Sequence, residues 1–291
     1  MLVVVRLSGG LGNQLFQYAA GRALSVKHNV PLYIEKSFYA ESPNRHYKLN
    51  SFNTCESVIS KRELVATLLK RKFKLSDYFK SVKSICLESN FLFSENSFSY
   101  NPDFLSIDVP VVLNGYWQSE KYFEEFFSWI KNDFKVIDNS GLLNAIFIDK
   151  ISTENSVAIH VRRGDYLSNK QINSIHGICS DEYYVTAYKE LVEKVGEVTP
   201  YFFTDDTEDA RRIIKLIGKG VLINDVCPGS DVSDFLLMTS CRHFIVANST
   251  FSWWAAYLGC SPSKMVFAPL NWFKSTDYNT IDLIPLNWIK I

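Results

Sequence analysis

The sequence predicts an α/β fold built on parallel β-sheets. Short apolar runs rich in valine, isoleucine and phenylalanine alternate with segments of helical periodicity, most regularly after residue 156. These runs are apolar at nearly every position, which is typical of strands buried on both faces of a parallel sheet. At the N-terminus a strand, a glycine-rich turn, a helix and a second strand follow one another in the order of a βαβ unit.

The individual elements follow from the spacing of the apolar residues. The apolar runs predict strands at residues 2–7, 30–34, 111–113, 157–161, 201–204, 221–223, 244–246 and 266–268. Helical spacing predicts helices at residues 13–27, 121–130, 181–195, 208–217, 231–239 and about 249–258, with Asp181 as an expected N-cap. Residues 138–154 have weak periodicity and indicate a linker. We therefore expect two domains, residues 1–150 and 151–291.

The composition limits the class of protein. Of the 291 residues, 47% are hydrophobic and 21% are charged, which provides ample material for a core. The formal net charge is zero, so we expect no nucleic-acid partner, because dedicated nucleic-acid binders are usually basic. The six cysteines show no C-x-x-C pair and no Cys/His ligand spacing, so we expect mostly free thiols and no metal site.

Two segments bear on location. The apolar run at residues 1–6 is too short for a signal peptide or a membrane span, and we expect a cytoplasmic protein. Residues 61–83 are basic, and apolar residues among them fall at helical spacing. Such a helix can lie on the anionic inner face of the cytoplasmic membrane, although a solvated helix face is the simpler interpretation.

The most informative strand ends in His160, Arg162, Arg163 and Asp165, with a sharp turn at Gly164. Ligands of open α/β sheets bind beyond the carboxyl ends of the strands, and guanidinium groups bind phosphate oxygens through a planar fork. His160 and Arg162 share one face of the strand, whereas Arg163 faces the other side and is expected to be structural. An ordinary strand with a solvated charged end is the alternative.

Two further strand ends carry polar groups. Asp205 and Asp206 follow one strand, and a carboxylate there could accept paired N–H bonds from a purine edge. Ser249, Thr250 and Phe251 open a helix after another strand, where hydroxyls and amides suit a phosphate. Together with the arginine fork, these groups predict a site for a nucleoside diphosphate. Helix capping is the alternative role for Asp205 and for the hydroxyls of Ser249 and Thr250.

The N-terminal turn at residues 8–12 does not match the dinucleotide fingerprint G-x-G-x-x-G. Its glycines still allow the backbone to approach a ligand, and the amides of the following helix favour anions. Alternatively, the glycines only fit the helix against the strand, and Asn13 is only its N-cap.

An aromatic pair follows the strand at residues 111–113. Tyr116 and Trp117 stand beside Gln118, and such a group could stack on a sugar ring and hydrogen-bond its hydroxyls. Packing in the core is the alternative role for both rings.

Four blocks of the sequence together resemble the bacterial α-1,2-fucosyltransferases of glycosyltransferase family 11. They are GGLGNQLFQYA at residues 9–19, HVRRGDY at 160–166, FTDD at 203–206 and NSTFSWW at 248–254. The blocks occur in the order of the family and span nearly the whole chain. The resemblance implies the GT-B fold, with two Rossmann-like domains facing a cleft. It also implies transfer of L-fucose from GDP-β-L-fucose to the 2-hydroxyl of a galactose-terminated glycan, with inversion and with no metal or other cofactor.

The resemblance also implies roles for single residues. Arg162 is expected to bind the β-phosphate and to stabilise the departing GDP, while His160 orients the diphosphate or the sugar. The remaining expected donor contacts are Gly10, Asn13 and Gln14 from the first domain and Asp205, Ser249, Thr250 and Phe251 from the second. Asp165 is the candidate base for the acceptor hydroxyl.

Three alternatives remain open from the sequence. The chain could transfer fucose to another position or use another GDP-sugar. It could instead bind a sugar nucleotide or a glycan without catalysis. It could also act as a peripheral membrane module through residues 61–83, where a lipid-linked acceptor would lie close by.

Overall fold

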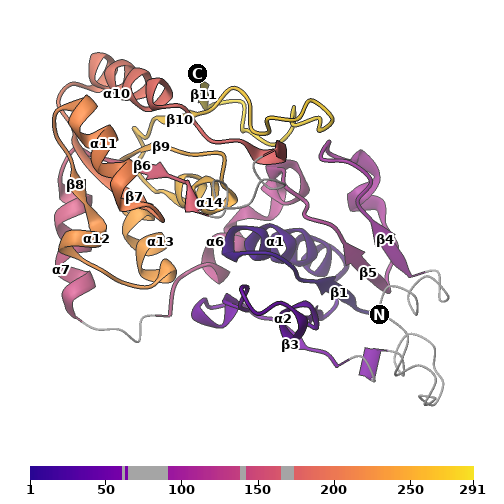
Figure 1. Ribbon diagram of the computed structural model, residues 1–291. Helices are drawn as coiled ribbons and strands as arrows, with labels where there is room; N and C mark the ends of the chain where they lie inside the picture. Colours follow the sequence, from indigo (N-terminus) through magenta and orange to yellow (C-terminus); the bar gives the residue numbers. More distant parts are fainter. Residues whose placement is uncertain (61–62, 65–90, 138–141, 165–173) are drawn as a thin grey trace. The chain divides into compact units, whose positions relative to one another are not determined.

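The computed structural model describes residues 1–60, 63–64, 91–137, 142–164 and 174–291 (Figure 1). The chain divides into one unit formed by Met1–Lys135 with Asn279–Leu283 and a second formed by Val136–Tyr278 with Ile284–Ile291. The basic segment at residues 61–83 lies outside the described residues apart from Glu63 and Leu64.

The division falls earlier than the predicted boundary at residue 150. Helix α7 (Leu142–Thr153) belongs to the second unit because it packs against strand β6 (Ser156–Val161) and helix α13 (Asp231–Thr239). The weakly periodic segment is therefore partly a packed helix. The short segment Asn279–Leu283, which belongs to the first unit, is held there by Asp282. The Asp282 carboxylate accepts the N–H of Tyr100 at 2.9 Å and forms an ion pair with Lys121 at 2.6 Å.

The described part of the first unit contains a five-stranded parallel sheet in the order β3-β2-β1-β5-β4. Its strands are β1 (Val3–Arg6), β2 (Leu32–Glu35), β3 (Ser57–Val58), β4 (Leu92–Ser94) and β5 (Val111–Asn114). The sequence predicted β1, β2 and β5. It missed β3 and β4, because these edge strands have two and three residues and carry no buried apolar run.

Helix α1 (Leu11–His28) covers this sheet as the βαβ pattern predicted. It ends at Asn29, which adopts a left-handed conformation and whose N–H bonds to the carbonyls of Ser25 and Val26. The close approach of α1 to β1 requires Gly21, because a Cβ there would lie 2.1 Å from Cγ2 of Val5.

The remaining helical turns of this unit are short. They are α2 (Phe38–Glu41), η1 (Leu49–Ser51), η2 (Pro102–Ser106), η3 (Glu120–Tyr122), η4 (Glu124–Phe126) and α6 (Phe127–Asp133). The prediction of a single helix at residues 121–130 is wrong. Phe123 leaves the helical conformation, with φ −147° and ψ 0°, and its ring is buried beside Tyr122. Burial of both neighbouring rings breaks the helix into separate turns.

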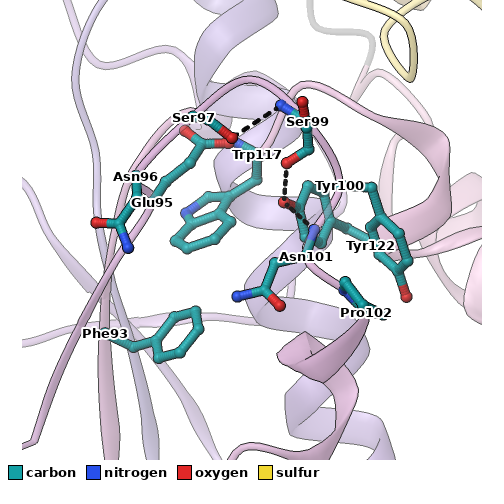
Figure 2. A pocket seen from close by; sticks show the side chains of 10 residues that line it. All are labelled: Phe93, Glu95, Asn96, Ser97, Ser99, Tyr100, Asn101, Pro102, Trp117 and Tyr122. Carbon is teal, nitrogen blue, oxygen red and sulfur yellow. Dashed lines mark hydrogen bonds between the residues drawn. The ribbon is translucent and has the colours of Figure 1, made fainter. Parts of the chain in front are cut away.

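A cavity of about 250 Å³ lies in the first unit, beyond the carboxyl ends of β4 and β5 (Figure 2). The described residues that line it are partly aromatic, namely Phe93, Tyr100, Trp117 and Tyr122, and mostly polar otherwise.

The described part of the second unit contains a six-stranded parallel sheet in the order β11-β10-β9-β6-β7-β8. Besides β6, its strands are β7 (Thr199–Thr204), β8 (Val221–Leu222), β9 (His243–Ile245), β10 (Val266–Ala268) and β11 (Ile289–Lys290). Besides α7 and α13, its helices are α10 (Asp181–Val195), α11 (Thr207–Ile217), α12 (Ile223–Val226) and α14 (Thr250–Leu258). The predicted strand and helix alternation is confirmed here, while β11 was missed because it has two residues.

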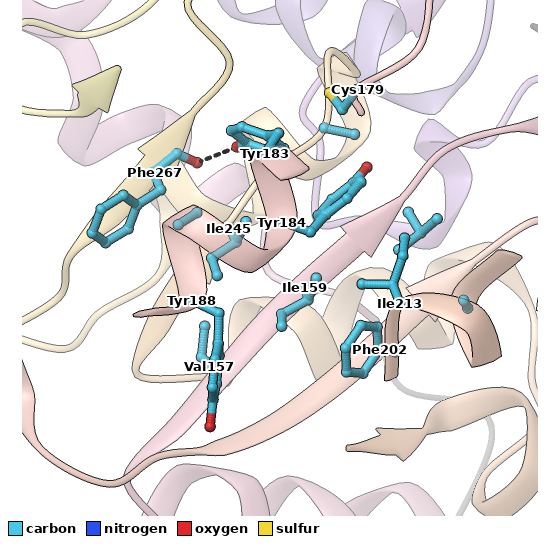
Figure 3. Packing of buried hydrophobic residues seen from close by; sticks show 14 of the residues in the cluster. Val157, Ile159, Cys179, Tyr183, Tyr184, Tyr188, Phe202, Ile213, Ile245 and Phe267 are labelled. Atoms are coloured by element: carbon cyan, nitrogen blue, oxygen red, sulfur yellow. Dashed lines mark hydrogen bonds between the residues drawn. The ribbon is translucent and has the colours of Figure 1, made fainter. Parts of the chain in front are cut away.

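Strand β6 separates two chemically different faces of this sheet. Val157, Ile159 and Val161 pack against residues of α10 and α11 in a continuous core (Figure 3). The alternate residues Ala158 and His160 point to the opposite face, because successive side chains of a strand alternate. On that face the His160 ring meets Phe251 of α14. One face of β6 is therefore packed in the hydrophobic core, and the opposite face carries the polar side chain of His160.

The Gly21→Ala substitution tests the packing of α1 on β1. Alanine usually stabilises a helix interior relative to glycine, but here its methyl group must displace the stiff, buried side chain of Val5. We expect the free energy of unfolding to fall by about 1–3 kcal/mol, as for other overpacked cores. Urea denaturation measures it, and a more stable variant would contradict this packing.

Candidate active site

Strand β6 delivers two arginines to different environments. Arg163 is 1% exposed, and its Nε lies 2.7 Å from Asp209 while its Nη2 lies 3.5 Å from Asp181. Its guanidinium also stands over the ring of Tyr184 at 5.8 Å. The side chain of Arg162 is 25% exposed. The predicted difference between the two faces is confirmed, and Arg163 is the structural arginine.

Asp205 joins the end of β7 to the end of β6. Its Oδ1 accepts the backbone N–H of Arg163 at 2.8 Å, and its Oδ2 lies 2.8 Å from Nη1 of Arg162. The contact orients the Arg162 guanidinium. It also explains Gly164, because a Cβ there would lie 2.4 Å from the Asp205 carboxylate.

His160 is a buried, uncharged imidazole. It is 5% exposed, and burial together with the nearby charge of Arg162 lowers the pKa of its imidazole to about 3. Its ring centroid lies 5.6 Å from that of Phe251. Among the described residues, Nδ1 of His160 has no hydrogen-bond partner. A buried polar atom without a partner is costly, so this atom is suited to contact a ligand.

The start of α14 lies beside this histidine. Ser249 is the N-cap residue and is 8% exposed, yet within the described structure its side chain makes no capping hydrogen bond. The first turn of α14 contains no acidic residue, so its N–H groups and helix dipole favour an anion. Phe251 contacts both His160 and Phe235 of α13, and thereby brings the start of α14 to the end of β6.

The other polar residues near these strand ends have structural roles. Asp206 caps α11 by accepting the N–H groups of Glu208 and Asp209, while Ser180, rather than the predicted Asp181, caps α10. Asn248 is buried, and its amide donates to the carbonyls of His176, Gly177 and Trp272. The candidate base Asp165 lies outside the described residues.

The sequence did not single out Asp234 as a candidate site residue. Burial and the neighbouring charge of Asp231 raise the pKa of the Asp234 carboxyl to about 6. It precedes Phe235, which packs on Phe251 at 5.5 Å. Perturbed carboxyl groups of this kind cluster at functional sites. The sequence showed only an acidic helix start, which is an ordinary feature of helices.

The candidate residues of the first unit surround the turn between β1 and α1. Gly10 is the N-cap of α1, and Asn13 accepts the side-chain amide of Gln118 at 3.1 Å. Gln14 is fully buried and donates to the carbonyls of Gly9 and His46. Its Oε1 accepts the N–H of Lys48. These bonds give Gln14 a positioning role in the turn, which its polar side chain alone did not reveal.

Within the described ranges, no three His, Cys, Asp or Glu side chains gather as a metal ion requires. The cysteines at positions 55, 179, 227, 241 and 260 are free thiols, in agreement with their scattered spacing. In the described part of the chain, no helix has the length and apolar character needed to cross a membrane.

A family model for glycosyl transferase family 11 matches residues 2–291. The chain belongs to glycosyltransferase family 11. Relatives of this glycosyltransferase include α-1,2-colitosyltransferase of Escherichia coli, at 33% identity over 100% of this chain and 99% of the relative. The O-antigen biosynthesis glycosyltransferase WbnK of Escherichia coli is 28% identical over 98% of this chain and 99% of the relative. Galactoside α-(1,2)-fucosyltransferase 2 of Oryctolagus cuniculus is 23% identical over 87% of this chain and 66% of the relative.

The solved structure of fucosyltransferase NodZ from Bradyrhizobium has a similar fold, with a TM-score of 0.51. The match covers 91% of the family 11 chain and 95% of NodZ at 14% sequence identity. This likeness concerns the fold alone. The two Rossmann-like units belong to the GT-B class, as the sequence resemblance implied.

The buried His160 should make stability depend on pH. Below about pH 6.5 the unfolded chain protonates this histidine, whereas the folded chain, with a pKa of about 3, does not. The free energy of unfolding should therefore fall as the pH falls, by about 2 kcal/mol between pH 6.5 and pH 5.

The His160→Gln variant removes this titrating group, so its free energy of unfolding should fall less than that of the wild type between pH 6.5 and pH 5. Denaturant unfolding of both proteins at several pH values measures the difference. Parallel pH dependences would show that His160 is not held in its neutral form.

Proposed function

We propose that this family 11 glycosyltransferase transfers L-fucose from GDP-β-L-fucose to the 2-hydroxyl of a terminal galactoside, with inversion at the anomeric carbon. The observation that carries the proposal is the meeting of His160, Arg162 and the start of α14 at one edge of the second sheet. A cation, a neutral imidazole and a helix N-terminus form a site suited to a diphosphate. Family membership and the named α-1,2-transferring relatives support the linkage.

In the proposed reaction the acceptor oxygen attacks the anomeric carbon while the bond to the β-phosphate oxygen breaks. The electron pair of that bond remains on GDP, so negative charge collects on the β-phosphate. Arg162, oriented by Asp205, stabilises this charge as it develops. The acceptor proton passes to a base, for which Asp165 remains the candidate.

The neutral state of His160 decides its part in this reaction. Because its pKa is about 3, the imidazole carries no charge near neutral pH and contributes a directional hydrogen bond. Its Nδ1 is buried and has no hydrogen-bond partner within the described ranges, so we assign the hydrogen bond with a donor oxygen to this atom. The amides that begin α14, at Ser249, Thr250 and Phe251, bind the remaining phosphate oxygens in the same proposal.

The guanine base of GDP-fucose needs a carboxylate that accepts hydrogen bonds from its N–H groups. Asp205 was the predicted residue, but both of its oxygens already contact Arg162 or the N–H of Arg163. Asp234 is the stronger candidate because, among the described residues, no cationic side chain is paired with its carboxylate, and burial raises its pKa. Paired N–H groups of guanine would compensate a carboxylate that is otherwise costly to bury.

A second donor deserves a direct comparison, since a relative 33% identical over the whole chain is an α-1,2-colitosyltransferase. Colitose is L-fucose without its 3-hydroxyl. A site that hydrogen-bonds this hydroxyl strongly rejects the deoxy sugar, whereas a site without such a bond discriminates weakly. The ratio of kcat/KM for GDP-fucose and GDP-colitose identifies the donor.

The proposed transfer requires no metal ion. Incubation with GDP-fucose and lactose in excess EDTA should yield lactose fucosylated at the 2-hydroxyl of galactose. In the absence of acceptor, slow hydrolysis of GDP-fucose is expected, because water can replace the acceptor. Activity that appears only after manganese or magnesium is added would contradict metal independence. Tight GDP-fucose binding without hydrolysis or transfer to any glycan would favour a binding protein.

Arg162 should contribute more to turnover than its neighbour. Lysine supplies a point charge without the planar fork, so Arg162→Lys should lower kcat at least about 10²-fold, on the scale of removing one oxyanion donor. Arg163→Lys should lower kcat much less and should instead reduce thermal stability, because it disturbs buried contacts with Asp209 and Asp181.

Steady-state kinetics of both lysine variants, with circular dichroism to verify folding, measure this difference. A well-folded Arg163→Lys variant that loses more turnover than Arg162→Lys would reverse the assigned roles.

A further inference from the structure

Strand β7 ends in Thr204, a residue that is 9% exposed and that no step of the proposed reaction uses. Strands β6 and β7 are neighbours in the parallel sheet, and Thr204 stands opposite Val161 in their register (Figure 1). Val161 immediately precedes Arg162 along the chain. The Thr204 side chain is therefore next to the point where β6 delivers its partly exposed arginine.

The Thr204 hydroxyl contacts three backbone groups at these two strand ends. Its Oγ1 lies 2.8 Å from the carbonyl oxygen of Val161 and 2.9 Å from that of Asp206. The single hydroxyl hydrogen is donated to one of these carbonyls at a time. The same oxygen accepts the N–H of Asp206 at 2.9 Å, which makes the residues after β7 an ST-turn. One side chain thus joins the end of β6 to the turn that begins α11.

Asp205 lies within this turn, between two residues that the hydroxyl holds. Thr204 is buried on one side of it, and Asp206, whose N–H bonds to the hydroxyl, caps α11 on the other. The backbone of Asp205 is therefore fixed from both directions. This is the geometry in which its carboxylate lies 2.8 Å from Nη1 of Arg162 and 2.8 Å from the backbone N of Arg163.

The two peptide groups that flank Arg162 are both held by side chains. The carbonyl of the preceding peptide, that of Val161, accepts the Thr204 hydroxyl. The N–H of the following peptide, that of Arg163, donates to Asp205, and its carbonyl accepts Nη1 of Arg163 at 3.2 Å. Each residue has only two soft backbone dihedrals, so fixing both neighbouring peptide planes sets the direction of the Arg162 Cα–Cβ bond.

Water does not replace the Thr204 hydroxyl at this position. Val161 is 0% exposed, so its carbonyl would remain unsatisfied if the hydroxyl were removed. The β-branched threonine side chain is stiff about χ1, which gives the hydroxyl a defined position. Groups that stabilise charge must be held within about 0.5 Å of their productive position. A small displacement of these strand ends would therefore reduce what Arg162 contributes.

We propose that Thr204 is a positioning residue of the transfer reaction. Its hydroxyl acts through the peptide before Arg162 and through Asp205, and it holds the Arg162 guanidinium in the direction that the diphosphate requires. The proposal rests on the proposed function, in which Arg162 stabilises the charge that collects on the β-phosphate. Because the hydroxyl acts through Arg162, its effect on turnover should disappear when Arg162 is changed.

Two substitutions at position 204 separate the hydroxyl from the shape of the side chain. Thr204→Val keeps the branched shape without the hydroxyl and should lower kcat for transfer to lactose about tenfold. Thr204→Ser keeps the hydroxyl and should recover most of this loss. Thr199→Val is the matched control, because Thr199 begins the same strand at the opposite edge of the sheet. An equal loss in the control would contradict the proposal.

The Arg162→Lys background distinguishes positioning from a general loss of structure. In that background Thr204→Val should lower kcat by less than about twofold and should not further weaken GDP binding measured by calorimetry, because the group that it positions is already absent. The acceptor KM for lactose should be equal in wild type and Thr204→Val, since Arg162 acts on the leaving group. Equal losses of kcat from Thr204→Val in both backgrounds would show that Thr204 acts independently of Arg162.

Crystal structures of wild type and the variants test the positioning without any activity. Thr204→Val should lose the contact between Asp205 and Arg162, and Thr204→Ser should keep it. Thr204→Ala, which also lacks the hydroxyl, gives the same comparison if the valine variant does not fold. If wild type neither hydrolyses nor transfers from GDP-fucose, the proposed function fails and these structures still decide the positioning. A folded variant without the hydroxyl that keeps this contact, kcat and GDP affinity would overturn the proposal alone.

Discussion

The carboxylate of Asp205 is the contact on which the candidate active site depends. It lies at the end of β7 and binds two groups at the end of β6, the backbone N–H of Arg163 and the guanidinium of Arg162, both at 2.8 Å. One carboxylate thus fixes the path of the chain after β6 and the direction of the arginine that faces the ligand. The glycine at position 164 follows from this contact, because no side chain fits against Asp205 there.

Arg163 anchors the same strand end from the other face. Its guanidinium is enclosed by Asp181 of α10, Asp209 of α11 and the ring of Tyr184. A buried charge network of this kind is weak evidence for stability, but it restricts the geometry of the groups it contains. Arg162 remains partly exposed one residue away, so the rigid and the ligand-accessible parts of the site are neighbours in sequence. This is the arrangement that preorganised charge stabilisation requires.

Much of this organisation could be predicted from the sequence, because it depends on period-two alternation along one buried strand. That rule assigned His160 and Arg162 to one face and Arg163 to the other. Asp205 was the alternative cap of α11 expected from the sequence, and this is wrong, because Asp206 caps the helix and only the turn geometry distinguishes the two carboxylates. The short edge strands β3, β4 and β11 were missed because two or three residues give no periodicity. The bonds of Gln14 could not be predicted from the sequence, because two of its partners, the carbonyl of His46 and the N–H of Lys48, lie 32 and 34 residues away along the chain.

The first unit follows a different principle, in which aromatic packing and a strained backbone define a cavity. Trp117 was expected either to stack on a sugar or to pack in the core, and its ring does pack in the core while also lining the cavity. The left-handed conformation of Trp117 could not be predicted from the sequence, because it is held by the contact of Glu95, a residue of another strand end, with the backbone N–H of Trp117.

A crystal structure of the protein with GDP tests the central claim most directly. The account predicts that the β-phosphate contacts the Arg162 guanidinium and the N–H groups that begin α14, with the His160 ring within hydrogen-bond distance of a phosphate or ribose oxygen. Asp205 should keep its bond to the N–H of Arg163. A diphosphate bound away from Arg162 and α14 would contradict the account.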